Sequence, residues 1–478
     1  MKIIISVALG LLVVIVAVTL HGYLRVPSPS KTIPLSGQKF PEGFLWATGE
    51  DAYQHEGGND NNDWYLWEKR DPSPIDNGDR NIRGIDFYNR YEQDFTLAKN
   101  DRQNAHRIGI EWSRVEPERG RYDEAAWRHY ENMLKSLKDK DFTVFLNLWH
   151  FTLPVWAAEQ GGWENPALME RWDRYVTECA RRFGRYVDYW STTIDAQIYA
   201  LNGHAVGAIP PNRRDMDLAI TVYRTMIRAH ARAYHIIKKE AAVPAGSRHD
   251  KPQIGMIYFF FYYEPQGHIL DRFVCRQMDD IFNWQMLDAL HTGKIDIGVL
   301  GTPTIRETDE SVRGTLDWIG VNYYTRQIIS FNLFKPGFIE YTDLKRYSTT
   351  DMGWEIYPEG IYRICKELGR RYEGVPLCIT ESGLADADDD RRPRYIADHL
   401  TWVHRLIQEG CPLFGFTYWS LLDNWEWEKG FWPKFGLYRV DLESLARTPR
   451  GSVKLYRFIS KQNRLPDEAE YAGMGFEK

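Results

Sequence analysis

Two carboxylates far apart in the sequence, Asp195 and Glu381, each end a short run of apolar and β-branched residues. Arg107, His150 and Tyr324 lie in or at the end of three similar runs. If these runs are parallel strands of one barrel, their carboxyl ends open on one face, where the five side chains converge. Facing carboxylates are what glycoside hydrolysis needs, one protonating the leaving oxygen and one attacking or activating water at the anomeric carbon.

A second group of candidate residues is rich in tryptophan. Trp419 is followed by the segment Asn424-Trp425-Glu426-Trp427-Glu428, in a chain that holds 18 Trp, 28 Tyr and 22 Phe. Aromatic faces stack on the C–H face of a sugar ring, while carboxylates and amides bind its hydroxyls. This segment therefore suits a pyranose pocket. We interpret the six consecutive aromatics from Tyr258 to Tyr263 mainly as barrel packing, with one ring as a candidate for the aglycone side.

Eight strands are needed to position these residues, and the sequence offers eight candidates. About 55 residues separate one from the next, enough for a strand, a helix and long loops in an α/β (β/α)8 TIM barrel. The expected helices between them include Glu124–Lys138 and Pro166–Phe183. The strands are predicted at Phe44–Thr48, Ala105–Trp112, Thr143–His150, Tyr189–Asp195, Ile254–Tyr262, Trp318–Tyr324, Leu377–Glu381 and Phe414–Leu422.

Five motifs give the chain a specific resemblance. They read FLWATGEDAYQHEG (44–57), RIGIEWSR (107–114), GVNYYT (320–325), ITESG (379–383) and YWSLLDNWEW (418–427). With these motifs the sequence resembles glycoside hydrolase family 1, the β-glucosidase and β-galactosidase family of retaining (β/α)8 enzymes. The resemblance covers residues from about 40 to 464.

The resemblance implies a role for each matching position. Glu381 stands in the family's T-E-N-G motif, here TESG, as the nucleophile, and Arg107 and Tyr324 match the residues that orient it. A cationic partner keeps such a carboxylate ionised. Trp419 matches the residue beneath the sugar ring. The hydroxyl-binding positions correspond to Gln54, His150, Glu426 and Trp427. The implied substrate is a β-linked glucose-like or galactose-like unit, and neither a metal nor another cofactor is implied.

The chain departs from the family at the acid/base motif T-x-N-E-P, where it reads TTIDA (192–196). In one register Asp195 replaces the acid/base Glu, Ile194 the Asn and Ala196 the Pro. In the alternative register, with one inserted residue, Asp195 pairs with the Asn and no acid remains. Asp is one methylene shorter than Glu, which withdraws the carboxyl by about 1.5 Å. Ile194 cannot hydrogen-bond a sugar 2-hydroxyl, so we expect tolerance of a sugar lacking or modified at that position.

The N-terminus predicts a membrane anchor. Ile3 to Leu20 is an uncharged run of 18 residues, close to the length that spans a bilayer. We expect a retained transmembrane helix over residues 1–21, a Pro/Ser linker over 22–39 that holds the barrel away from the membrane, and the barrel over 40–478. A cleaved signal peptide and a buried soluble helix are the alternatives. One cation, Lys2, precedes the uncharged run, and three cations follow it at positions 25, 31 and 39. Because the side of a membrane span that carries more Lys and Arg usually faces the cytoplasm, this asymmetry predicts a catalytic domain on the cytoplasmic side.

Composition excludes other classes. The formal net charge is −6, with no basic surplus for a phosphate backbone, so nucleic acid is not an expected partner. The five cysteines are odd in number and lack a C-x-x-C pair, which indicates reduced thiols.

Three functional hypotheses remain open. The first is a membrane-anchored retaining β-glycosidase that acts on a glycolipid or another amphiphilic glycoside. The second is a transglycosylase, or a glycosyltransferase-like enzyme, that passes a glycosyl unit from Glu381 to an acceptor. The third is a non-catalytic sugar-binding protein. The intact set of Glu381, Arg107 and Tyr324 argues against the third, because a binding protein has no need of a positioned nucleophile.

Overall fold

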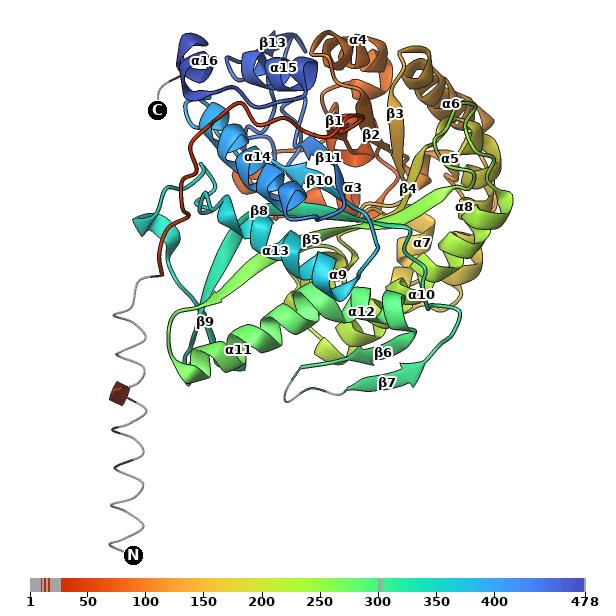
Figure 1. Cartoon of the computed structure of the whole chain (residues 1–478). Helices are drawn as coiled ribbons and strands as arrows, with labels where there is room; N and C mark the ends of the chain where they lie inside the picture. Colours follow the sequence, from red (N-terminus) through yellow and green to blue (C-terminus); the bar gives the residue numbers. More distant parts are fainter. Residues whose placement is uncertain are drawn as a thin grey trace, which may run out of the picture.

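The fold is a closed barrel of eight parallel strands (Figure 1). The computed structural model describes residues 27–299, 302 and 304–476, together with positions 10, 13, 16 and 17. The barrel strands are β1 (Leu45–Glu50), β2 (Ala105–Gly109), β3 (Thr143–Asn147), β4 (Tyr189–Ile194), β5 (Gln253–Pro265), β8 (Trp318–Phe331), β10 (Leu377–Ser382) and β11 (Leu413–Tyr418). Each predicted strand overlaps one of these, which confirms the (β/α)8 barrel.

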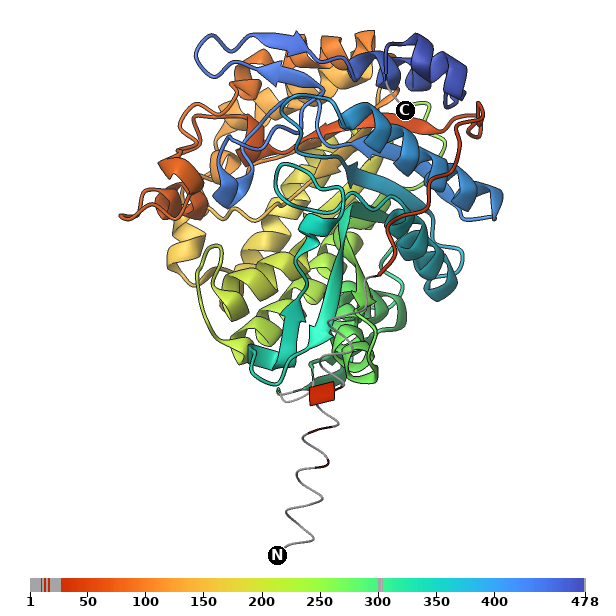
Figure 2. The same cartoon turned by 90° about the vertical axis from the view of Figure 1, so that its left-hand side faces the viewer.

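The strands follow the order β10-β11-β1-β2-β3-β4-β5-β8, and a pairing of β8 with β10 closes the ring. Every pair within the ring is parallel, so all carboxyl ends open on one side. Strands β5 and β8 run past the barrel rim and stay paired as far as Pro265 and Ile329. Beyond the rim, β8 turns back into the antiparallel strand β9 (Ile339–Tyr341), and Figure 2 shows this ribbon at the lower end of the molecule.

Amphipathic helices cover the barrel. In α8 (Leu168–Phe183) the buried side chains recur three or four residues apart, so one stripe packs inward while Glu170 and Arg174 face solvent. The remaining helices are α2 (Ala52–His55), α3 (Asp63–Glu68), α4 (Phe87–Asn100), α5 (Trp112–Val115), α6 (Glu124–Asp139), α7 (Val155–Glu159), α9 (Ala196–Ala200), α10 (Met216–Glu240), α11 (Ile269–Asp279), α12 (Gln285–Thr292), α13 (Glu359–Arg371), α14 (Arg392–Gln408), α15 (Val453–Gln462) and α16 (Glu468–Gly473).

Smaller elements complete the fold. Two π-helical turns, η4 (Leu201–Val206) and η5 (Asp280–Trp284), continue α9 and α11. Two short ribbons lie outside the barrel, β6 (Lys294–Ile297) with β7 (Ile305–Thr308), and β12 (Tyr438–Val440) with β13 (Arg447–Pro449). The predicted helices at 124–138 and 166–183 are found as α6 and α8. The five cysteines are free thiols, as expected.

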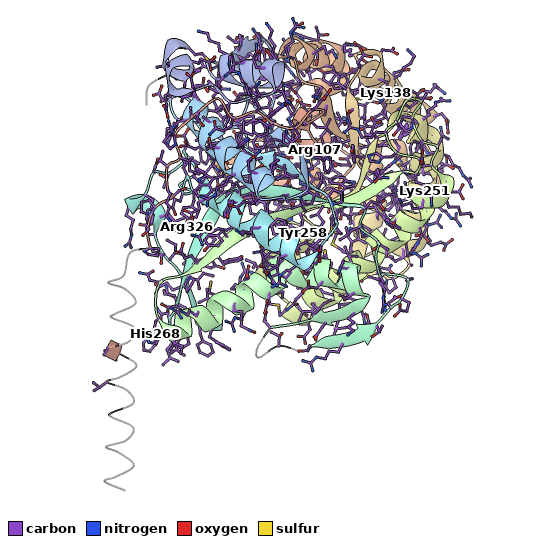
Figure 3. All side chains as sticks on the ribbon, viewed as in Figure 1. Arg107, Lys138, Lys251, Tyr258, His268 and Arg326 are labelled. Atoms are coloured by element: carbon purple, nitrogen blue, oxygen red, sulfur yellow. The ribbon has the colours of Figure 1, made fainter. Side chains whose placement is uncertain are left out.

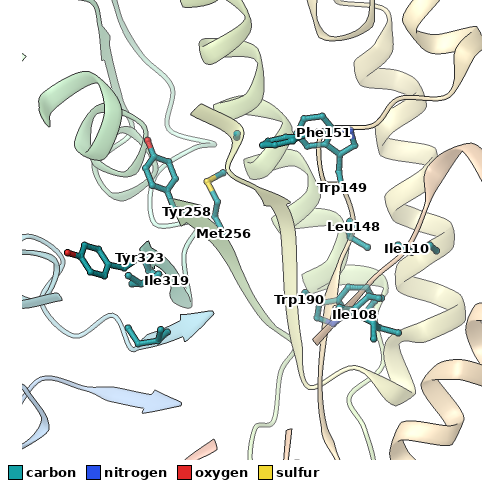
Figure 4. Packing of buried hydrophobic residues seen from close by; sticks show 14 of the residues in the cluster. Ile108, Ile110, Leu148, Trp149, Phe151, Trp190, Met256, Tyr258, Ile319 and Tyr323 are labelled. Atoms are coloured by element: carbon teal, nitrogen blue, oxygen red, sulfur yellow. The ribbon is translucent and has the colours of Figure 1, made fainter. Parts of the chain in front are cut away.

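The core between barrel and helices is heavily aromatic. Figure 4 shows Trp149 beside Phe151 and Trp190 beside Ile108 among the buried side chains of this core. A separate cluster fills the barrel interior, where Phe145 stacks on Tyr189 with ring centroids 4.7 Å apart. Close aromatic packing therefore accounts for much of the aromatic excess seen in the composition.

The segment expected to be a spacer is held against the barrel wherever the structure describes it. Tyr347 donates a hydrogen bond to the Pro27 carbonyl at 2.8 Å, and Leu35 is buried. Tyr347 in turn packs on the guanidinium of Arg326, which is ion-paired with Glu355. The linker prediction rested on Pro/Ser composition alone, which carries no information about these long-range partners. Residues 27–39 therefore add no free spacer length.

The predicted membrane span at residues 3–20 lies almost entirely outside the described residues. Among the helices that the structure describes, none combines the length and hydropathy needed to cross a bilayer.

Candidate active site

The predicted site residues converge on one cavity of about 610 Å³ at the carboxyl ends of the barrel strands. Figure 3 places Arg107, whose guanidinium lies beneath this cavity, among the barrel strands. The predicted residues that line the cavity directly are Gln54, His150, Asp195, Tyr324, Glu381, Trp419, Glu426 and Trp427. They come from six strands or the loops that follow them, so residues far apart in the sequence lie around one cavity.

Glu381 is held from two sides at the end of β10. Its Oε1 lies 2.8 Å from Arg107 Nη2, and its Oε2 accepts a hydrogen bond of 2.7 Å from the Tyr324 hydroxyl. Arg107 is fully buried on β2, with its guanidinium 5.1 Å from the centroid of Trp419. Burial raises the pKa of Glu381, while the charge of Arg107 and the Tyr324 hydrogen bond oppose that rise.

A third buried carboxylate, Asp51, was not singled out from the sequence. Its Oδ2 lies 3.1 Å from the same Arg107 Nη2 atom and 3.2 Å from His150 Nδ1. Asn147 donates a 2.9 Å hydrogen bond to its other oxygen. Although burial alone raises a carboxyl pKa, Arg107 and His150 hold the pKa of Asp51 well below its usual value. The sequence feature that could have identified Asp51 is its position directly after a buried strand, within the motif 44–57.

Asp195 follows β4 and faces the same cavity. Asn322 donates to its Oδ1 at 3.2 Å, and Thr380 fixes the Asn322 amide by donating to the amide oxygen at 2.8 Å. Its backbone φ of 52° lies in the left-handed region, which aspartate tolerates better than most residues. Burial and the negative charge of Glu381 raise the pKa of Asp195 well above its usual range. Both effects favour the protonated form of this carboxyl.

Ile194 does not line the cavity. Its side chain belongs to the apolar cluster inside the barrel, with Phe145 and Ile257. One extra residue of β4 lies between Ser191 and Ile194 relative to β5, an irregularity that sets which way the following side chains face. Ile194, which the first register pairs with the family Asn, therefore packs in the barrel interior. Asp195 supplies the polar side chain that this segment presents to the cavity.

The expected sugar-binding side chains form a connected wall. Trp419 donates from Nε1 to Glu426 Oε1 at 3.0 Å, and Gln54 donates to the Trp425 carbonyl at 2.9 Å. Gln54 Oε1 is buried and has no hydrogen-bond partner within the described residues, so it is available to a ligand. Trp427 packs 4.9 Å from the His150 ring. Burial raises the pKa of Glu426 well above its usual range.

The opposite side of the cavity is apolar, and we call it the apolar wall. Within Tyr258–Tyr263 the side chains alternate along β5, so three rings line the cavity where the sequence suggested one. Val206, Met216 and Tyr341 line the cavity and are also exposed, so the apolar wall reaches the molecular surface. Its members are Ile198, Leu201, Val206, Ile209, Met216, Phe259, Phe261, Tyr263, Met278, Ile281, Phe282 and Tyr341.

No group of three or more metal-ligating side chains gathers anywhere in the described part of the chain. The titratable groups described above at the cavity or directly beneath it are the carboxyl groups of Asp51, Asp195, Glu381 and Glu426, the Arg107 guanidinium, the Tyr324 phenol and the His150 imidazole.

Comparison with known proteins identifies the family. The model of glycosyl hydrolase family 1 matches residues 36–465. The chain belongs to glycosyl hydrolase family 1. The β-galactosidase of Pyrococcus woesei is 32% identical to it, over 90% of this chain and 99% of that protein. Beta-glucosidase A of Thermotoga maritima is 31% identical over the same share of each.

Solved structures of similar proteins share the fold. A β-glycosidase from Pyrococcus horikoshii superposes with a TM-score of 0.81 at 33% identity, covering 93% of this chain and 99% of that one. A Thermotoga maritima β-glucosidase in complex with glucoimidazole gives a TM-score of 0.82 at 29% identity, covering 89% and 100%. The protein is a family 1 glycosidase.

Proposed function

We propose that this family 1 glycosidase hydrolyses β-linked glucosides or galactosides of amphiphilic alcohols, glycolipids above all, with retention of configuration. The observation that carries the proposal is that Glu381, held by Arg107 and Tyr324, shares one cavity with Asp195. Burial and the charge of Glu381 favour the protonated form of Asp195. Two carboxyl groups in different protonation states at one site are the requirement of the retaining mechanism.

In the first step, a Glu381 oxygen attacks the anomeric carbon and the bond to the leaving oxygen breaks. Asp195 gives its proton to that oxygen, so the alcohol departs neutral and a glycosyl ester of Glu381 forms. Arg107 and Tyr324 bind the carboxylate in the orientation from which it attacks. They also stabilise it as the leaving group of the second step.

In the second step, Asp195 is ionised and accepts a proton from water while the water oxygen attacks the anomeric carbon. The ester bond breaks, Glu381 returns as a carboxylate and Asp195 is protonated again. Once Glu381 is esterified, its negative charge no longer acts on Asp195. The pKa of Asp195 therefore falls between the two steps, as an acid that becomes a base requires.

The apolar wall supports an amphiphilic aglycone. Aliphatic and aromatic side chains line the side of the cavity opposite the sugar-binding residues and continue to the surface at Val206, Met216 and Tyr341. An acyl or alkyl chain gains from leaving water for such a wall by about 0.8 kcal/mol per methylene. The same wall favours an amphiphilic alcohol over water as acceptor, so transglycosylation is the second candidate function.

Covalent labelling with an activated aryl β-glycoside, with and without azide, tests the mechanism. An activated leaving group needs little protonation, and azide replaces base-assisted water in the second step. We expect mass spectrometry to find the sugar on Glu381. Strong azide stimulation would identify Asp195 as a poor acid/base, and the absence of any label on Glu381 would leave only a sugar-binding role.

Chain-length dependence tests the substrate class. We expect kcat/KM to rise with alkyl length in a series of alkyl β-glucosides and to fall for long chains in Met278→Glu, while methyl glucoside is unaffected. Ile82→Glu, at an exposed position outside the cavity, is the matched control. A flat series would argue against an amphiphilic aglycone. Product analysis with added lipid alcohols separates hydrolysis from transfer.

A further inference from the structure

Exposed apolar side chains gather on one part of the surface. From residue 27 onward, the described chain has eleven large apolar residues that are exposed, and six of them belong to α11 and the β8–β9 hairpin. We propose that this surface, the α11–hairpin face, docks on a negatively charged lipid bilayer. The six residues are Ile269, Phe273, Leu333, Phe334, Phe338 and Tyr341.

The first half of the face is the outer side of α11. Ile269, Arg272, Phe273 and Arg276 are all exposed and are spaced as one stripe of a helix. The opposite stripe, with Val274 and Cys275, is buried against the protein. A surface helix of a globular protein normally turns a polar stripe outward. An outward stripe of large apolar and basic residues is instead typical of a helix that lies in a membrane interface.

The second half is the tip of the hairpin, where Phe334 is 91% exposed. This tip is firmly held. Phe331 and Phe338 stack with centroids 5.8 Å apart, and Asn332 accepts a hydrogen bond from the Phe334 backbone at 2.9 Å. The Phe331 backbone donates to Asp271 on α11 at 2.8 Å, which joins the two halves. Figures 1 and 3 show β9 and His268, the residue before α11, on the same lower side of the molecule.

The charge of this face has the opposite sign to that of the whole chain. Five exposed cations border it, none of them ion-paired within the described residues: Arg272, Arg276, Lys335, Lys345 and Arg346. Three carboxylates lie among these cations: Asp271 caps α11, Asp343 accepts from the Lys345 backbone, and Glu340 on β9 accepts from the Asn332 side chain at 2.8 Å. The five cations outnumber them. The chain as a whole carries −6. Such a basic border favours anionic lipid head groups over a neutral surface.

The path of the chain favours a lipid bilayer as the partner that covers the α11–hairpin face. Pro27 is hydrogen-bonded to Tyr347, which directly follows Lys345 and Arg346 of the basic border. Only six residues lie between Leu20 and Pro27, so at most about 25 Å of fully extended chain joins the uncharged 18-residue run to Pro27. The described chain from Pro27 onward thus begins beside the basic border, a few residues after a sequence long enough to cross a bilayer.

Docking there brings the membrane to the cavity. Tyr341 belongs both to the α11–hairpin face and to the apolar wall, and Met278 on α11 lines the same wall. A lipid chain leaving the bilayer at this face therefore reaches the apolar wall without crossing bulk water.

Fluorescence of a label on the full-length chain tests the docking. An environment-sensitive fluorophore is attached at Phe334→Cys and, as the matched control, at Leu442→Cys beside the β12–β13 ribbon. The unsubstituted chain, labelled in the same way, measures the background from the partly exposed Cys411. Both labelled proteins are mixed with vesicles of phosphatidylcholine and phosphatidylglycerol that carry nitroxide-labelled lipid.

We expect the label at 334 to shift to the blue and lose at least half of its emission to the nitroxide, while the label at 442 does neither. Adding Arg272→Glu and Lys335→Glu to the Phe334→Cys protein should reverse both effects on anionic vesicles. Equal behaviour of positions 334 and 442 would overturn the proposal. A blue shift that grows with protein concentration without vesicles would assign the face to a second copy of the chain instead. The readout needs no turnover, so its failure would leave the proposed function standing.

Discussion

Replacing Asp51 with asparagine removes one of two negative charges that share a single guanidinium nitrogen. Asp51 Oδ2 and Glu381 Oε1 lie 3.1 and 2.8 Å from Arg107 Nη2. Asp51 is ionised throughout the working range because its pKa is held well below the usual value. Its charge therefore raises the pKa of Glu381 at every pH at which the enzyme works, against the opposing effect of Arg107.

The size of this effect follows from the shared contact. Two oxygens that both touch one nitrogen at these distances are at most about 6 Å apart. At an effective dielectric constant of about 20, two unit charges at about 6 Å repel by about 2.8 kcal/mol. One pH unit corresponds to about 1.4 kcal/mol, so the Asp51→Asn change should lower the pKa of Glu381 by about two units.

The pH profile of kcat/KM on an activated aryl β-glycoside measures this shift. Its acidic limb reports ionisation of the attacking carboxylate in the free enzyme. In Asp51→Asn the limb should move about two units toward lower pH. Tyr324→Phe is the matched variant of opposite sign, because it removes a hydrogen bond that lowers the pKa of Glu381, so its limb should move upward.

An acidic limb that stays in place in Asp51→Asn, or moves upward, would refute the electrostatic reasoning. Thermal unfolding of both variants checks that the fold is kept, since a displaced Arg107 would change the profile for another reason.

Three further predictions concern neighbouring positions. In Gly49→Ala the new Cβ would lie 2.7 Å from Arg107 Nε, so the Arg107 side chain must shift. Steady-state kinetics should then show kcat/KM falling by about tenfold or more while the fold stays intact. Unchanged kinetics would show that Arg107 adapts without loss of function. Asp195→Asn should lower kcat/KM on alkyl glycosides by about 10²–10⁴ and on activated aryl glycosides far less; equal losses on both would argue against its role as an acid. Ile194→Asn places an unpaired amide in the apolar interior of the barrel. Urea denaturation should show a free energy of unfolding lower by about 1–3 kcal/mol, and the activity should not rise. A higher activity would mean that the side chain at 194 reaches the sugar.

The sequence predicted the barrel, and with it the strand ends that carry the candidate site residues, because both depend on local pattern. Eight runs of apolar and β-branched residues specify eight strands, and in a parallel barrel the residues at the strand ends have only one face on which to meet. Glu381, Arg107, Tyr324 and the tryptophans after β11 are therefore recognisable from their positions along the chain.

Other features depend on pairing between distant segments. Asp51 meets Arg107 only because β1 and β2 pair in the register that sets Gly49 beside Arg107. The rings of Tyr258–Tyr263 divide between core and cavity because β5 and β8 stay paired beyond the rim, where one side faces the cavity. Residues 27–39 lie on the barrel because Tyr347, more than three hundred positions away, holds Pro27.

Composition and periodicity indicate which residue types recur along one strand or helix. They do not indicate which other strand or helix packs against it. Register and side-chain direction are set by long-range pairing, and a shift of one residue along a strand turns every side chain to the other face. The sequence thus determined that Glu381 lies at the end of a barrel strand, whereas the charged groups around it and the apolar wall of the same cavity were decided by the tertiary structure.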